Sequence, residues 1–358
     1  MSEYIPVSPE RAGLELDEFL CLQFPNLNKG FLRRQVREGR VLVDGSPSKP
    51  SARLREQQVV IVDIDEEEED RFPLPPVAPP ERIPVLYEDR HVVVVDKPAG
   101  LSSEPERWAR SRASLAGALL ELALERGGGA PGQPQEAAPE APTLSFRPRL
   151  VHRIDKGTTG AVVVAKDLET ERRLRRAFDE GRVAKTYLAV VEGEHPLADG
   201  ESELIDRPID HDARRSGRMR VVSRGGKPSR TRVAVERRFR GFSLLRCEPL
   251  TGRTHQIRVH LASEGFPLAV DPLYGRRKAL ALSEIKAGYR PKPGRLERPL
   301  IDRLSLHAWR LSFPASGDPA PPGEERRVAV EAPVPADLER LLKQLAKVRP
   351  YRRGGGRP

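Results

Sequence analysis

The chain has 358 residues, and at roughly 150 residues per domain this length predicts about two domains, each with its own hydrophobic core. No apolar run approaches the ~20 residues of a membrane helix, so we expect no membrane association. The two distant cysteines, Cys21 and Cys247, exclude a disulfide framework and a cysteine-rich metal site. The first residues lack the layout of a secretory signal, so a cytoplasmic protein is expected.

Basic residues outnumber acidic ones, 62 to 52, which gives a formal net charge of +10. Such an excess is typical of proteins with an anionic polymer as partner, most simply a nucleic acid, although composition alone equally fits a generally charged surface. The excess is concentrated in certain segments. Residues 207–240 hold twelve basic and three acidic residues, whereas residues 63–70 hold seven acids in eight positions.

The first segment reads as a small α+β unit. Leu16, Phe19 and Leu20 recur at helical spacing, and a second helix is predicted over residues 29–38, ending at Gly39. Residues 41–43 then form a predicted strand before an Asp-Gly turn, and residues 59–62 supply a later strand.

The second predicted helix carries a basic face, which is either a solvated surface or a row of phosphate contacts. The pattern "LDEFL…FPNLNKGFLRRQVREGRVLVDGSPSKPSARL" resembles the small S-four-like RNA-binding domain of RNA-modifying enzymes over residues 12–64. Glu15 departs from the family, which often has Arg there. The resemblance implies that the basic face binds RNA through Lys29, Arg33, Arg34 and Arg37.

An acidic and proline-rich stretch, residues 65–80, is predicted to be an extended linker to a second domain over residues 81–335. Within that domain, residues 127–142 form a low-complexity insertion to which we assign no chemistry. Residues 336–358 are predicted to be a basic C-terminal tail.

The second domain interleaves strands and helices irregularly, not as a strict βαβ series. This order predicts an α+β fold with a mixed, mainly antiparallel central sheet. The predicted strands are 91–95, 161–165, 183–191, 232–238 and 242–248, and the predicted helices are 114–125, 168–180 and 254–264.

The segment "HRIDKGTTG" gathers His152, Arg153, Asp155 and Lys156 between apolar segments. A carboxylate flanked by cations is held ionised, as a nucleophile or general base must be. The same residues also fit an ordinary charged turn, so at this point both interpretations stay open.

The segment "TGRTHQIRVHLASEG" places Arg253 just before a predicted helix, where the helix dipole favours anions. An arginine there indicates a carboxylate or phosphate partner. His255 and His260 lie five positions apart on this helix and point in different directions, which argues against a metal site. The chain also lacks a glycine-rich phosphate loop and a serine-hydrolase elbow.

Five motifs occur in the order seen in RluA-type pseudouridine synthases: "HRIDKGTTGAVVVAK", "KTYLAVVEG", "TGRTHQIRVHL", "DPLYG" and "LHAWRLSF". Together with "VVVVDKPAGL" upstream, the resemblance covers residues 83–313. It implies the pseudouridine synthase fold, isomerisation of uridine in RNA, and no cofactor or metal. The front domain is typical of the subgroup that modifies large-subunit ribosomal RNA, although transfer RNA stays open as substrate. We expect a monomer.

Carried over by position, the resemblance makes Asp155 the catalytic aspartate, by attack on the sugar, attack on the base or a glycal route. Tyr187 corresponds to the tyrosine that stacks on the uracil and is a candidate for proton removal. Arg253 corresponds to the arginine that pairs with the aspartate. His152 and Arg153 are expected to contact RNA, with Arg153 filling the gap left by the flipped nucleotide.

Two departures concern substrate contacts: the family often has a His-Pro pair where this chain has Ser102-Ser103-Glu104-Pro105, and Val270 replaces the usual Gly.

The competing interpretation is a catalytically idle RNA-binding or ribosome-assembly factor, which the loss of Asp155, Tyr187 or Arg253 would favour. A nucleoside or glycoside hydrolase is less consistent, because that chemistry generally uses two carboxylates and the motif supplies only one.

Overall fold

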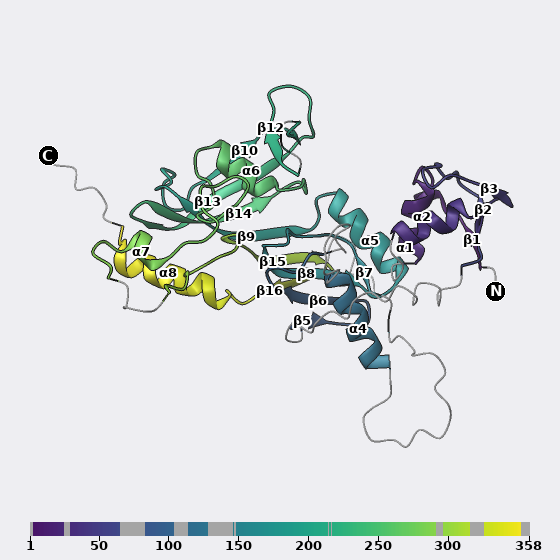
Figure 1. The fold of residues 1–358 in the computed structure, drawn as a ribbon, viewed down its shortest axis with the longest axis horizontal. Helices are drawn as coiled ribbons and strands as arrows, with labels where there is room; N and C mark the ends of the chain where they lie inside the picture. The colour runs from purple at the N-terminus through teal and green to yellow at the C-terminus, as the bar shows by residue number, and fades with distance from the viewer. Residues whose placement is uncertain are drawn as a thin grey trace, which may run out of the picture. The chain divides into compact units, whose positions relative to one another are not determined.

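The computed structural model describes residues 3–24, 29–64, 83–103, 114–127, 146, 148–213, 215, 217–290, 296–315 and 326–351 (Figure 1). The chain forms two compact units. The first comprises Met1–Glu81 with Glu104–Arg149, and the second comprises Arg82–Ser103 with Leu150–Pro358. The predicted linker 65–80, and residues 128–142 of the predicted insertion, lie outside the described residues.

The first unit contains a four-stranded antiparallel sheet in the order β1-β4-β2-β3. Its β2–β3 turn places Asp44 and Gly45 at positive φ (51° and 76°), as a tight Asp-Gly hairpin turn requires. The elements are β1 (Glu3–Pro6), η1 (Pro9–Arg11), α1 (Leu16–Gln23), α2 (Lys29–Arg37), β2 (Val41–Val43), β3 (Ser46–Pro47), β4 (Val59–Val62) and α4 (Leu115–Gly127).

The predicted amphipathicity of the two front helices is confirmed. Leu16, Phe19 and Leu20 of α1 pack in one core with Phe31 and Leu32 of α2, and all five are buried. The polar side chains of α2 are thereby left on its other faces.

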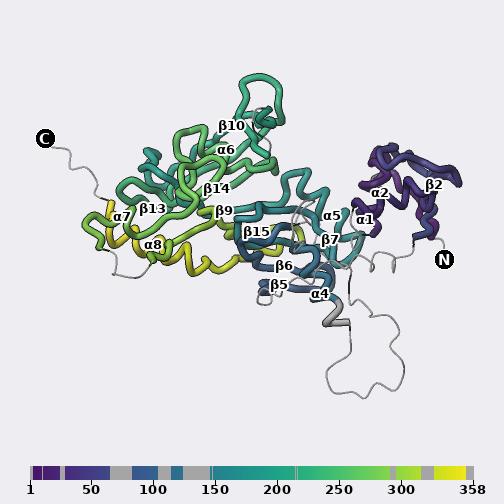
Figure 2. Tube along the Cα trace, in the orientation of Figure 1, coloured from purple at the N-terminus to yellow at the C-terminus, as the bar shows by residue number. Residues whose placement is uncertain are grey.

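The second unit is built on a ten-stranded sheet, which confirms the α+β class with a mixed, mainly antiparallel sheet. Among the strands on the main path only β8 and β15 run parallel, and Figure 2 traces the chain through both. The strands are β5 (Val85–Glu88), β6 (Val92–Lys97), β7 (Arg149–Leu150), β8 (Thr159–Ala165), β9 (Ala184–Glu192), β10 (Ser202–Asp206), β13 (Arg230–Phe239), β14 (Phe242–Pro249), β15 (Leu306–Pro314) and β16 (Arg327–Glu331).

Besides this sheet, the described residues of the second unit form four helices and a hairpin that the sequence did not predict. Helix α5 begins as predicted, because the Asp167 side chain accepts a hydrogen bond from the Thr170 amide at 2.7 Å. The hairpin strands are β11 (Ile209–His211) and β12 (Met219–Val221), and the helices are α5 (Leu168–Asp179), α6 (Gln256–Ser263), α7 (Leu282–Ile285) and α8 (Ala336–Val348). No helix among the described residues is long and apolar enough to span a membrane.

Gly160 fixes the centre of the sheet. It pairs with Lys97 of β6 on one side and with Ala308 of β15 on the other. Its φ is +117°, and an added Cβ would lie 2.2 Å from the Ala308 carbonyl oxygen. Only glycine allows this close approach, so the start of β8 is held at a defined place beside β6 and β15.

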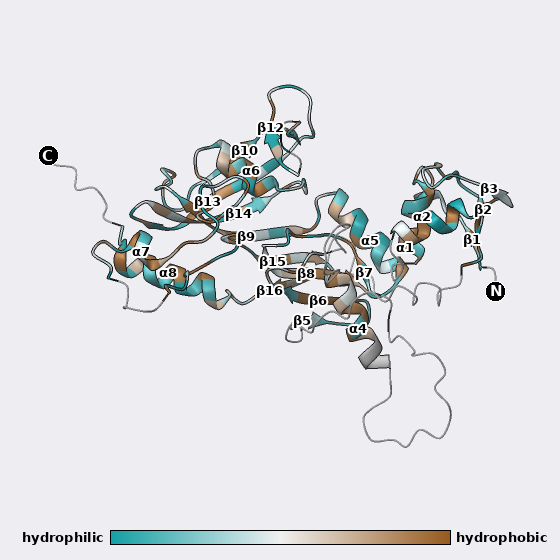
Figure 3. Cartoon of the chain, in the orientation of Figure 1, coloured by the Kyte–Doolittle hydropathy of each residue, from teal (hydrophilic) through white to brown (hydrophobic). Residues whose placement is uncertain are grey.

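The C-terminal segment differs from the prediction of a basic tail, because residues 336–348 form helix α8. Leu338, Leu341 and Leu345 are fully buried in a core shared with β9 and β14. Figure 3 shows apolar and polar residues along this helix. Arg303 binds Asp337 at the helix start through two hydrogen bonds of 2.6 and 2.7 Å. Arg340, Lys343 and Lys347 of the predicted tail thus belong to a packed amphipathic helix, whereas residues 352–358 lie outside the described residues.

Replacing Leu341 by Ala should lower the free energy of unfolding by about 2–5 kcal/mol, because it leaves a cavity in a core without exposed surface. The matched control is Lys343→Ala on the exposed side of the same helix, which should change it by less than about 0.5 kcal/mol. Urea unfolding followed by Trp309 fluorescence measures both, since Trp309 packs against this core. Equal effects of the two changes would contradict the packed-helix interpretation.

Candidate functional site

The candidate site lies where the loop after β7 enters β8. Asp155 is in this loop, and its backbone oxygen accepts a bond from the Thr158 amide at 2.9 Å. The segment after β6 fastens the loop from the other side: the Gly100 amide donates to the Lys156 oxygen at 2.8 Å, and the Ser103 hydroxyl donates to the Ile154 oxygen at 3.2 Å. Asp155 is therefore held between two bonded neighbours, Ile154 and Lys156.

Lys97, which the sequence did not indicate as a site residue, holds the segment after β6 (residues 98–103) in place. Its side chain is fully buried, and Nζ donates to the backbone oxygens of Pro98 and Leu101 at 2.8 and 2.7 Å. Burial lowers the pKa of Lys97 to about 7. The sequence signal was its place at the end of an apolar strand, where a buried lysine needs internal acceptors.

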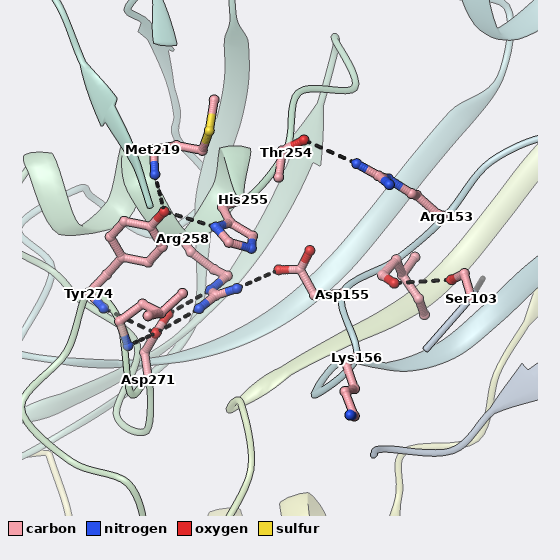
Figure 4. Close-up of polar contacts among 12 residues, drawn as sticks. Ser103, Arg153, Asp155, Lys156, Met219, Thr254, His255, Arg258, Asp271 and Tyr274 are labelled. Atoms are coloured by element: carbon pink, nitrogen blue, oxygen red, sulfur yellow. Dashed lines mark hydrogen bonds and ion pairs between the residues drawn. The ribbon is translucent and has the colours of Figure 1, made fainter. Parts of the chain in front are cut away.

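Asp155 is held by one arginine, Arg258, which bridges two carboxylates (Figure 4). Arg258 Nη1 donates to Asp155 Oδ2 at 2.8 Å, while Nε and Nη2 donate to the two oxygens of Asp271 at 2.8 and 2.9 Å. Asp271 has no exposed surface and Arg258 only 5%, but the Asp155 side chain is 25% exposed. The site thus presents one accessible carboxylate backed by a buried cation.

The groups around Arg258 favour its protonated form. Burial alone would lower the pKa of Arg258, but the hydrogen bonds and negative charges of Asp271 and Asp155 raise it above its ordinary value. The guanidinium therefore stays protonated and supplies Asp155 with a permanent positive neighbour. Such a carboxylate is able to act as a nucleophile or as a base.

The prediction that Arg253 pairs with Asp155 is wrong. The Arg253 side chain is exposed, and its Nε donates to the Pro228 oxygen at 3.2 Å. Helix α6 begins at Gln256, so Arg253 lies in the preceding loop, whereas Arg258 lies within the helix. The available signal was that Arg258 stands in a short, otherwise buried helical stretch, where a charge must be paired.

Tyr187 lies on β9, opposite Ala308 of β15 in the sheet register. Ala308 also pairs with Gly160, and Gly160 with Lys97, so one row of the sheet runs from the buried lysine to this tyrosine. Burial, with the charge of Asp155 adding to it, raises the pKa of Tyr187. The phenol is therefore protonated at neutral pH, which disfavours the predicted role in proton removal and leaves stacking and hydrogen-bond donation.

The two residues predicted to contact RNA beside Asp155 have different environments. Arg153 is exposed, and its Nη2 reaches the Thr254 hydroxyl at 3.4 Å. His152 stacks on Phe178 with ring centroids 4.8 Å apart, and its Nε2 accepts the Val163 amide at 3.0 Å. Burial lowers the pKa of His152 to about 3. The structure thus gives His152 a packing role in place of the expected RNA contact.

No group of three or more His, Cys, Asp or Glu side chains among the described residues is arranged to hold a metal ion. His260, considered above as a metal ligand, is buried, with Nδ1 at 2.9 Å from the Thr231 hydroxyl and Nε2 at 2.9 Å from the Arg207 oxygen. Both ring nitrogens are thus occupied by structural hydrogen bonds.

In the first unit, half of the predicted basic RNA-binding face is engaged internally. Arg33 Nε lies 2.5 Å from Asp17 Oδ2, and Lys29 Nζ lies 3.2 Å from Oδ1 of the same carboxylate, which has no exposed surface. Arg34 lies over the Phe31 ring and 3.8 Å from Glu38. Arg37 is exposed and makes no ion pair within the described part of the chain. Lys29 and Arg33 therefore join α1 to α2.

Replacing Arg33 by Gln should lower the stability of the first unit by about 1–3 kcal/mol, because a buried carboxylate loses a charged hydrogen-bond partner. The matched control is Arg37→Gln on the same helix, and its stability should lie within about 0.5 kcal/mol of that of the wild type. Hydrogen exchange of peptides from α1 and α2, read by mass spectrometry, compares the variants locally. Unchanged exchange in the Arg33 variant would show that the ion pair is not structural.

The chain resembles proteins of one family. Residues 91–263 match the RNA pseudouridylate synthase family. The chain is 35% identical to ribosomal large subunit pseudouridine synthase D of Neisseria meningitidis serogroup B, over 95% of this chain and 81% of that protein. It is 33% identical to ribosomal large subunit pseudouridine synthase C of Escherichia coli K12, over 96% and 97%. The solved structure of human RNA pseudouridylate synthase domain containing 4 is 23% identical, covers 73% of this chain and 92% of that one, and gives a TM-score of 0.47.

Proposed function

The chain belongs to the RNA pseudouridylate synthase family, and we propose that its substrate is a uridine of large-subunit ribosomal RNA, which it isomerises to pseudouridine. The observation that carries the activity is the accessible carboxylate of Asp155, bound at 2.8 Å by the buried Arg258. The ribosomal substrate is supported by the names of relatives that match 95–96% of the chain, its first unit included.

In the proposed reaction the bond between uracil N1 and the ribose C1′ breaks, and C5 of the uracil bonds to C1′ instead. The C5 proton is released and N1 is protonated, so the product is an isomer of the substrate. Because atoms and oxidation state balance within the nucleotide and water, we propose that no cofactor takes part.

Asp155 is the proposed catalytic group. Attack on the sugar, attack on the base and the glycal route all require an ionised carboxylate with open access to the nucleotide. Arg258 supports each of them in two ways: it places a positive charge beside the carboxylate, and its clamp on Asp271 fixes where Nη1 points.

The other proposed roles follow from exposure and protonation. Tyr187 stacks on the uracil or donates through its hydroxyl, because its raised pKa keeps it protonated. The target nucleotide must leave its stack to reach Asp155, and the exposed Arg153 is the side chain proposed to fill the gap.

In the first unit, Arg34 and Arg37 are proposed to meet phosphates, since Lys29 and Arg33 pair with Asp17.

We also propose that the chain acts as a monomer in the cytoplasm. The monomer is supported by the site itself, because Asp155, Arg258 and Asp271 come from one chain. The compartment is supported by the proposed ribosomal substrate and by the two cysteines, neither of which is in a disulfide.

Replacing Asp155 by Asn should abolish isomerisation and leave RNA binding nearly intact, because it removes a charge while keeping the shape. Pseudouridines are mapped in ribosomal and transfer RNA from cells with the gene, without it, and with the Asn variant. We expect the same large-subunit positions to disappear in the last two. If the lost pseudouridines are found only in transfer RNA, the substrate is transfer RNA and not ribosomal RNA. If no pseudouridine is lost, the result favours the catalytically idle RNA-binding factor.

Replacing Arg258 by Gln should lower the single-turnover rate by roughly 10²–10³ on saturating RNA, because it removes the donor that supports Asp155. The matched control, Arg253→Gln, should stay close to the wild-type rate, since Arg253 makes no bond to Asp155. Arg258→Lys keeps the charge next to the buried Asp271 but cannot clamp it in two places, so it guards against a variant that fails to fold. A larger loss at Arg253 than at Arg258 would overturn this assignment.

A further inference from the structure

The backbone at His255 is in an unusual conformation next to the site. Its φ of 57° and ψ of 18° lie in the left-handed region, which is uncommon for a residue other than glycine. His255 precedes helix α6, but its side chain makes no capping bond to the helix. A strained residue of this kind persists only when its surroundings fix it, and its side chain indicates what it is held for.

The side chain of His255 is held by Tyr274. Nδ1 of the ring lies 2.9 Å from the Tyr274 hydroxyl, and the two rings meet edge to face at 76° with centroids 5.6 Å apart. Tyr274 is itself fixed, because its hydroxyl accepts the Met219 amide at 2.8 Å and its ring lies 5.0 Å from the Arg258 guanidinium. The Tyr274 amide also bonds to Asp271 at 3.1 Å.

These bonds indicate where the Tyr274 hydroxyl hydrogen and the ring hydrogen of His255 lie. The Tyr274 oxygen already accepts the Met219 amide, and His255 Nδ1 is the one acceptor for its hydroxyl hydrogen among the hydrogen bonds of the described residues. Donation to Nδ1 is the arrangement that gives this hydroxyl hydrogen an acceptor, and in that arrangement a neutral imidazole carries its own hydrogen on Nε2. Burial lowers the pKa of His255, while the charges of Asp155, Arg258, Asp271 and Arg153 act on it in opposing directions. The lowered pKa favours the neutral ring at pH 7.

The Nε2 side of the ring faces the site. Figure 4 shows this edge of His255 turned toward the space in front of Asp155, on the opposite side of the ring from Tyr274. Nε2 makes no hydrogen bond to a described residue, and the side chain is only partly buried. A hydrogen-bond donor is therefore presented, without a protein partner, to the place where the nucleotide must bind.

We propose that His255 is a substrate-contacting residue whose Nε2–H donates a hydrogen bond to an oxygen of the target uridine, with Tyr274 as the positioning residue that holds the donor there. The inference rests on the proposed function, since the uridine bound at Asp155 supplies the acceptor. A uridine carries carbonyl oxygens on the base and hydroxyl oxygens on the ribose, and each is a suitable acceptor for a neutral donor.

Two substitutions of His255 separate this role from a structural one. Asn tolerates the left-handed backbone and places an amide group where Nδ1 meets Tyr274, but it has no donor at the Nε2 position. Gln is less suited to that backbone but extends an amide N–H to about the Nε2 position. A contact with the substrate therefore predicts that Gln is more active than Asn, whereas a structural role predicts the reverse order.

The experiment measures tritium release from a ribosomal RNA transcript labelled with [5-³H]uridine, under single-turnover conditions with saturating enzyme. We expect the Asn variant to lose about 100-fold in rate and the Gln variant to retain more, within about tenfold of the wild type. Thermal unfolding of both variants is measured in parallel. If the Asn variant reacts as fast as the Gln variant or faster, the proposed role of His255 is wrong. The proposed function still stands in that case, provided that the wild-type and Asp155→Asn enzymes behave as proposed.

A second measurement is independent of activity. Long-range ¹H–¹⁵N correlation of the imidazole nitrogens at pH 7 reports which nitrogen carries the hydrogen. We expect a neutral ring with the hydrogen on Nε2 in the wild type, and a mixture of tautomers in Tyr274→Phe, which keeps the ring but removes the hydroxyl. A hydrogen on Nδ1 in the wild type would overturn the inference. A wild-type enzyme that releases no tritium while showing the Nε2 tautomer would instead count against the proposed function.

Discussion

The site depends on one guanidinium shared between two carboxylates. Asp271 has no exposed surface, so its charge must be neutralised where it lies, and Arg258 does this with Nε and Nη2 together. Because a guanidinium is planar and rigid, binding two of its nitrogens also fixes the direction of the third. The buried Asp271 thereby determines where Nη1 meets Asp155, although it does not contact the accessible space itself.

The fixed direction of Arg258 Nη1 is useful only if Asp155 is fixed as well, and the sheet holds Asp155 in place. Asp155 is in a loop, but its neighbours Ile154 and Lys156 are bonded to the segment that the buried Lys97 holds together. Gly160 then brings β8 against β15 at a distance that no other residue allows. A flexible element is thus positioned by backbone hydrogen bonds to rigid ones, as catalytic loops on a scaffold generally are.

The sequence could predict what depends on local pattern: the amphipathic helices α1 and α2, the Asp167 cap, the main strands and the place of Asp155. It could not show which arginine reaches Asp155, because Arg253 and Arg258 are five residues apart and the start of α6 decides between them. Helix α8 was missed for a related reason. Its charges suggested solvent, and only the core that it completes with β9 and β14 explains its leucines.

The same limit applies to the basic surplus of the chain. A net charge of +10 indicates an anionic partner, but an arginine that already neutralises a buried carboxylate contributes little to binding one outside. Arg258, Arg33 and Arg303 each pair with a carboxylate within their own unit. Exposed residues such as Arg153 and Arg37 are the ones that we propose to meet RNA. Net charge therefore identifies the class of partner, whereas the ion pairs of the fold determine which side chains meet it.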